Sequence, residues 1–216
     1  MLQARPLASA ASGHVYRERL LRLLPDSPGH VVWLHAPLGY GKSILAAQWA
    51  ESLEIGGWRI IWAAMAGLTV QQTLAAALRL PAGIPWAVIH DELAREPTLL
   101  VLEDLSGPEQ LEPLLRGHHG ALILLASRTE LAEPELLRLH TEGRLIELTA
   151  DDLAFTAAEA RELAGQAGGN ADAHLQDTGG WPLLLHVALL TGNRDTGALH
   201  VALERSLSAR AWQETL

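Results

Sequence analysis

The sequence predicts an α/β fold, in which a doubly wound, mostly parallel five-stranded sheet is flanked by helices and followed by a small helical subdomain. Two observations predict this fold class. Five short runs are apolar almost throughout, which is typical of strands that are covered on both faces. Segments with helical periodicity separate these runs. The predicted strands are residues 30–36, 58–64, 98–104, 121–128 and 144–150.

The segment between the first two strands shows the helical pattern most clearly. Leu45, Trp49 and Leu53 recur at a spacing of four residues, and Gly56-Gly57 then ends the helix. Similar patterns predict further helices at 69–80, 85–95, 108–116 and 134–141. Alternating strands and helices predict one doubly wound domain over residues 1–150.

Residues 151–216 show no further strand pattern and predict a helical subdomain. Thr156 and Glu159 have the spacing of a capping box, in which each side chain satisfies a free amide at the start of a helix. Later helices are expected just before the Asp177-Thr178-Gly179-Gly180 segment, over 182–190 and around 199–210.

Composition excludes several functional classes. The chain has 25 acidic and 16 basic residues and a net charge of −9, so it is a poor electrostatic match for nucleic acid and direct binding is not expected. Arg5, Arg17, Arg19 and Arg22 are expected to lie on the surface. The sequence contains no cysteine, which excludes disulfides and thiolate metal sites.

The segment 1–14 lacks the apolar stretch of a secretory signal, and no run approaches the length of a membrane span. We therefore expect a soluble, cytoplasmic protein with no membrane partner.

A phosphate-binding loop is predicted between the first strand and the helix that follows it. Lys42 is the only lysine in 216 residues, whereas the other fifteen cationic side chains are arginine. Glycines allow successive backbone amides to surround an anion, and the helix N-terminus adds partial positive charge. The predicted nucleotide-binding residues are Ala36, Pro37, Leu38, Gly39, Tyr40, Gly41, Lys42, Ser43 and Ile44.

Individual residues of this loop have predicted roles. Lys42 is a compact point charge that reaches the β- and γ-phosphates of ATP or ADP, and Ser43 supplies a hydroxyl to Mg²⁺. Ala36 stands where the general pattern begins with glycine, and its methyl group is acceptable if its φ stays negative.

Two carboxylates and one arginine are predicted at the ends of neighbouring strands. Glu103 is expected near Mg²⁺, directly or through water, and Asp104 to orient or activate the attacking water; the assignment between them stays open. Arg128 follows the fourth strand and is a candidate sensor of the γ-phosphate, while Ser127 adds a polar group at the same edge.

Other side chains are interpreted as structural. The ten histidines show no metal-ligand spacing. Trp33, Trp49, Trp58 and Trp62 lie within or beside core elements and are expected to pack there.

Six segments together resemble the nucleotide-binding region of the signal-transduction ATPases with numerous domains, especially the large LuxR-type ATP-binding regulators, the group of the maltose-regulon activator. The segments are "VYRERLLRLL" (15–24), "APLGYGKSILAAQWA" (36–50), "LLVLEDL" (99–105), "LLASRTE" (124–130), "GRLIELTADDLAFTAAEA" (143–160) and "TGGWPLLL" (178–185).

The resemblance implies an ATP/ADP-dependent switch with nucleotide between the sheet domain and the helical part. It also implies that Pro182, in the Gly-x-Pro motif, lies near the adenine, and that Arg128 contacts the γ-phosphate. The family usually has Asp-Asp where this chain has Glu103-Asp104, and it often has acidic residues after the second strand, where 63–69 has none.

We therefore expect an ATP- or ADP-binding module of a transcriptional regulator with slow or absent hydrolysis. Its expected partners are nucleotide and either a second copy of the chain, by self-association, or further regulatory domains of a longer parent protein. Two alternatives stay open: a small-molecule P-loop kinase and an interaction module that does not bind nucleotide. The sequence leaves open whether the chain is a fragment.

Overall fold

The computed structural model describes residues 14–65, 67–105, 111–117, 120–167, 170–192 and 196–213. Residues 1–13, Arg5 included, lie outside the described residues. The described chain forms two compact units: residues 18–36 and 42–149, and residues 14–17, 37–41 and 150 onward. The predicted domains, 1–150 and 151–216, remain a prediction.

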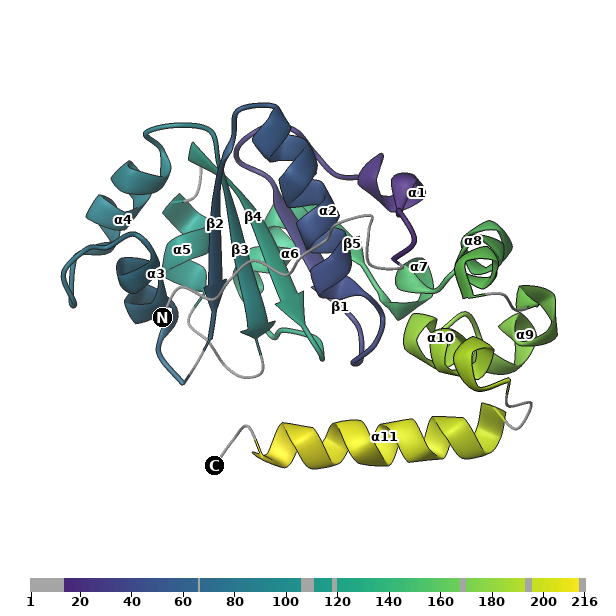
Figure 1. Ribbon diagram of the computed structural model, residues 1–216. Helices are drawn as coiled ribbons and strands as arrows, with labels where there is room; N and C mark the ends of the chain where they lie inside the picture. The colour runs from purple at the N-terminus through teal and green to yellow at the C-terminus, as the bar shows by residue number, and fades with distance from the viewer. Residues whose placement is uncertain are drawn as a thin grey trace. The chain divides into compact units, whose positions relative to one another are not determined.

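The first unit is built on a five-stranded sheet with the order β2-β3-β4-β1-β5 (Figure 1). Every described pairing in this sheet is parallel, which confirms the predicted α/β class. The strands are β1 (Val31–His35), β2 (Arg59–Ala64), β3 (Thr98–Leu105), β4 (Ala121–Ser127) and β5 (Leu145–Leu148).

Helices cover both faces of this sheet. The longest of them in this unit, α2 (Lys42–Ile55), packs against β2, β3 and β4, and the short α1 (Glu18–Leu21) packs against α2. On the other face, a buried core joins alternate strand residues to the remaining helices. These are α3 (Val70–Ala77), α4 (Trp86–Leu93), α5 (Glu112–Gly117) and α6 (Pro134–Thr141). Part of the predicted helix 108–116 falls outside the described residues.

The strand order determines which chain segments meet at the carboxyl edge of the sheet. Because β4 lies between β1 and β3, the residues that follow β4 are neighbours of those that end β1 and of those that end β3. Segments separated by more than sixty residues in the sequence therefore converge on one edge, where open α/β sheets bind their ligands.

The second unit is helical and has its own small core. Val15, Ala160, Leu163, Leu185 and Leu189 are buried together in it. Its elements are α7 (Ala150–Leu153), α8 (Ala157–Ala167), the 3₁₀ turn η3 (Ala171–Ala173), α9 (Leu175–Thr178), α10 (Pro182–Thr191) and α11 (Thr196–Gln213). No helix among the described residues combines the length and apolar character needed to cross a bilayer.

Arg17 corrects one expectation, since it is buried rather than exposed like Arg19 and Arg22. Its guanidinium donates to Glu159 (2.9 Å) and to the carbonyl of Leu153 (3.0 Å). Charge had suggested a surface position, but a carboxylate and a carbonyl supply the partners that a buried cation requires.

The predicted capping box at the start of α8 is confirmed. The amide of Thr156 donates to Glu159, and the amide of Glu159 donates to the hydroxyl of Thr156. Glu159 therefore serves two functions, because the same carboxylate that caps the helix also pairs with Arg17.

Glu159→Ala is expected to destabilise the protein by about 3–5 kcal/mol, because it leaves the Arg17 charge buried without its carboxylate and also removes the cap. Urea unfolding followed by circular dichroism measures this loss. Glu162→Ala, an exposed position on the same helix, is the matched control and should change the free energy of unfolding by less than about 0.5 kcal/mol. Equal effects of the two substitutions would contradict the assigned role.

Candidate functional site

The predicted phosphate loop connects β1 to α2, and its backbone has the conformation that glycine permits. Gly39 and Gly41 have φ angles of 83° and 79°, in the left-handed region that other residues avoid. Ala36 has no positive φ; among the described residues that are not glycine, only Arg79 and Asp104 do. The alanine in place of the first glycine is therefore unstrained, as its predicted role requires.

Contacts within the second unit fasten this loop to the start of α10. The amide of Leu183 donates to the carbonyl of Gly39 (3.1 Å), and the indole of Trp181 donates to the carbonyl of Leu38 (3.0 Å). A side chain at Gly39 would bring its Cβ to 2.7 Å from that of Leu183. Only glycine satisfies both the conformation and the space at this position.

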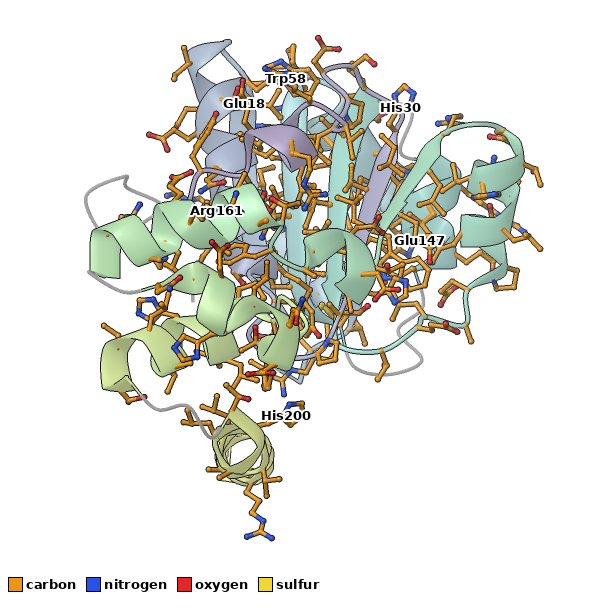
Figure 2. The ribbon with its side chains drawn as sticks, turned by 90° about the vertical axis from the view of Figure 1, so that its right-hand side faces the viewer. Glu18, His30, Trp58, Glu147, Arg161 and His200 are labelled. Atoms are coloured by element: carbon orange, nitrogen blue, oxygen red, sulfur yellow. The ribbon has the colours of Figure 1, made fainter. Side chains whose placement is uncertain are left out.

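Three aromatic rings lie next to these contacts between the loop and α10. Tyr40 stacks on Trp181 with ring centroids 6.1 Å apart. Trp181 also meets His200 edge-on at 5.1 Å, and His200 projects from α11 (Figure 2). Pro182, which the resemblance places near adenine, is buried at the first position of α10 between Trp181 and Leu183.

Lys42 begins α2, and its ammonium donates to the carbonyl of Ala36. This hydrogen bond closes the turn between the residue that follows β1 and the start of α2. The pKa of Lys42 is lowered to about 8, first by burial and second by the positive charge of Arg128; the carboxylates of Asp104 and Glu103 act in the opposite direction. Burial and Arg128 together therefore outweigh the two carboxylates at Lys42.

Glu103 ends the apolar part of β3 and directly contacts the predicted metal ligand Ser43. The Ser43 hydroxyl donates to Oε1 of Glu103. The Trp62 indole donates to the other oxygen, Oε2, at 2.5 Å. The structure thus brings the two predicted cation ligands together and adds Trp62, which sequence reasoning had treated as a packing residue.

Asp104 lies at an irregular point of β3. Its φ is 58°, and the register between β3 and β4 shifts between Leu102 and Leu105. This bulge leaves the Asp104 side chain exposed, 3.7 Å from the guanidinium of Arg128. A strained conformation next to a charged cluster is a common property of functional sites.

Ser127 departs from its expected place as a polar group facing a ligand. It is buried, accepts a hydrogen bond from the indole of Trp33 (2.9 Å) and donates one to the carbonyl of Thr129 (2.7 Å). Its hydroxyl is therefore used to hold the turn after β4. Arg128, which lies between Ser127 and Thr129 in the chain, is presented by that turn.

No family model matches the chain. The HTH-type transcriptional regulator MalT of Cronobacter sakazakii is 27% identical over 226 aligned residues, covering 88% of this chain. The HTH-type transcriptional regulator AlkS of Alcanivorax borkumensis is 27% identical over 227, covering 94%. The chain resembles one segment of HTH-type transcriptional regulators.

This segment is a small part of those regulators. The aligned region covers 25% of MalT and 24% of AlkS, so the chain spans about a quarter of the relatives it matches. The predicted resemblance to large regulators is confirmed. Together with the parallel sheet and the loop that ends in Lys42, it identifies the fold as that of a P-loop NTPase α/β domain.

Two solved structures align with the chain at low similarity. The crystal structure of Cdc6p from Pyrobaculum aerophilum aligns with a TM-score of 0.46 and 15% identity, covering 90% of this chain and 66% of that one. The structure of Drosophila ORC bound to DNA aligns with a TM-score of 0.43 and 14% identity, covering 91% and 57%.

Amine labelling tests the perturbed lysine directly. Only the neutral amine is nucleophilic, so the labelling rate of Lys42 is expected to rise with a midpoint near pH 8 in the folded protein, because burial and Arg128 disfavour the ammonium. Peptide mapping by mass spectrometry separates Lys42 from the terminal amine. The urea-unfolded chain is the control and should show a midpoint near an ordinary lysine value of about 10.4. The same midpoint in both states would contradict the assignment.

Proposed function

We propose that the chain is an ATP- or ADP-binding module of a transcriptional regulator, which acts as a switch with slow or absent hydrolysis. One observation carries the proposal: the only lysine of the chain lies half-buried where β1 passes into α2, with a lowered pKa and next to a left-handed glycine loop. Such a cation is stabilised by an anionic ligand.

In this proposal the loop amides of 37–41 and the α2 N-terminus bind the phosphates, and Lys42 neutralises their charge. Ser43 and Glu103 hold Mg²⁺, which supplies additional positive charge to the phosphates when bound. No group of three or more His, Cys, Asp or Glu residues suited to a metal occurs among the residues described. Two oxygen ligands from the protein, completed by phosphate and water, fit the usual manner of Mg²⁺ binding.

The switch is supported by the contacts of the loop. Leu38 and Gly39, whose carbonyls accept hydrogen bonds from Trp181 and Leu183, lie within the segment proposed to bind phosphate. A ligand that changes the loop conformation therefore changes the partners of the first turn of α10. Pro182 is proposed to line the adenine side, as the family resemblance implies.

The residues proposed for turnover are Asp104 and Arg128. Asp104 is exposed and carries a carboxylate that is available to orient water, while Arg128 is proposed to sense the γ-phosphate.

The module would belong to a longer regulator, because the relatives are transcriptional regulators about four times the length of the aligned segment. Binding of DNA would then be the task of other domains.

Lys42→Met is expected to weaken ATP and ADP binding about ten- to hundredfold, since a hydrogen bond to a charged group contributes about 1.5–3 kcal/mol. Isothermal titration calorimetry of the wild type and the variant measures this loss. Arg95→Met removes a charge from an exposed site on the first unit and is the control, with unchanged affinity expected. A wild-type protein that binds neither nucleotide would overturn the proposed function.

Asp104→Asn is expected to leave ATP affinity unchanged and to slow phosphate release about 100-fold, because the amide cannot act as a base. Asparagine also tolerates the left-handed backbone at this position, so the substitution does not add strain. Single-turnover phosphate release measures the effect, with Asp91→Asn as an exposed control. Equal rates for Asp104→Asn and the wild type would remove Asp104 from the mechanism.

A further inference from the structure

We propose that Trp62 is a positioning residue that fixes the carboxylate of Glu103 and thereby determines how this carboxylate meets a divalent cation. The inference rests on the proposed function, because the cation is the one that accompanies a bound nucleotide.

The parallel register of β2 and β3 places the two side chains on one face of the sheet. Trp62 pairs with Val101, and Ala64 pairs with Glu103. Side chains alternate along a strand, so Trp62 and Glu103 share a face at an offset of two residues, about 6–7 Å. The neighbours Ile61 and Leu102 belong to the core on the opposite face. An indole is long enough to span this offset, and its N–H reaches Oε2 of Glu103 at 2.5 Å.

Each partner needs the other. Trp62 is only 5% exposed, and a buried indole N–H requires an acceptor. Glu103 has one more rotatable bond than an aspartate would have, so its carboxylate has more positions to sample. The Trp62 indole on Oε2 and the Ser43 hydroxyl on Oε1 restrict it to one of them. Trp62 thus explains how the longer side chain can serve at this position.

The division of the two oxygens has a consequence for cation selectivity. Oε2 accepts a hydrogen bond from the buried Trp62 indole, and breaking this bond would leave the N–H buried without an acceptor. Oε1 accepts a hydrogen bond from the Ser43 hydroxyl, which is exposed and can rotate away. Glu103 is therefore prepared to offer one oxygen rather than two. Ca²⁺ often takes both oxygens of a carboxylate, and Mg²⁺ demands compact octahedral coordination. The arrangement favours Mg²⁺.

Trp62→Phe tests the proposal because it removes the indole N–H and retains an aromatic ring. ADP affinity is measured by calorimetry in EDTA, in Mg²⁺ and in Ca²⁺. In the wild type, Mg²⁺ is expected to raise ADP affinity above its value in EDTA, and the variant is expected to show an increase about tenfold smaller. The variant should also prefer Mg²⁺ over Ca²⁺ less strongly. Its ADP affinity in EDTA should change by less than about twofold.

Trp49→Phe is the matched control, since Trp49 is 3% exposed and lies on α2 rather than beside Glu103 in β2 or β3. Trp49→Phe should leave unchanged both the ratio of ADP affinity in Mg²⁺ to that in EDTA and the ratio of ADP affinity in Mg²⁺ to that in Ca²⁺. A Trp62→Phe protein with the wild-type Mg²⁺ enhancement and the wild-type preference would overturn the proposal, as would a wild-type protein whose ADP affinity does not respond to Mg²⁺.

A second measurement reads the contact without nucleotide. The seven tryptophan indole N–H signals can be resolved by nitrogen–proton correlation spectra and assigned by single Trp→Phe substitutions. Glu103→Gln is expected to move the Trp62 indole signal and to leave that of Trp49 in place. An unmoved Trp62 signal would overturn the inference. A moved signal in a protein that binds no nucleotide would keep the contact but overturn both the cation role and the proposed function.

Discussion

The rest of the site depends on an ammonium group that is partly withdrawn from water at the start of α2. Burial disfavours the charge of Lys42, and Arg128 disfavours it further. The carbonyl of Ala36 accepts its hydrogen bond, and the carboxylates of Glu103 and Asp104 offset part of the cost. All these groups are delivered by one unit of the chain, because β4 lies between β1 and β3 in a parallel sheet. The fold thus places two cations and two carboxylates at one edge of the sheet, around an ammonium group whose pKa is lowered.

Much of this arrangement could be predicted from residues that act through local rules. Apolar runs predicted all five strands, since a strand buried on both faces requires them. The Thr156 and Glu159 spacing predicted the start of α8, because capping is a matter of neighbouring residues. The lone Lys42 after two glycines predicted the loop between β1 and α2. In each case the information lies within a few consecutive residues.

Contacts that depend on strand register or on the packing of distant segments could not be predicted. The sequence pattern predicts that Trp33 and Trp62 are core residues, yet each donates its indole N–H to a polar side chain of another strand. A buried tryptophan usually has such a partner, but the sequence does not say which one. Arg17 is buried and pairs with the carboxylate of Glu159, 142 positions away in the chain, so the residues next to it in the sequence do not predict its burial. The left-handed backbone of Asp104 likewise arises from a bulge between strands.

That bulge makes the two adjacent acids of β3 unequal in the variation they can tolerate. Position 103 is constrained by its side chain, because both carboxylate oxygens have donors, while its backbone is ordinary strand. Position 104 is constrained by its main chain, which asparagine and glycine can adopt and β-branched residues cannot without strain. Substitution at the first position must therefore keep an oxygen acceptor, whereas folding at the second requires only a residue able to turn the chain, so any demand for a carboxylate at 104 comes from chemistry and not from the fold.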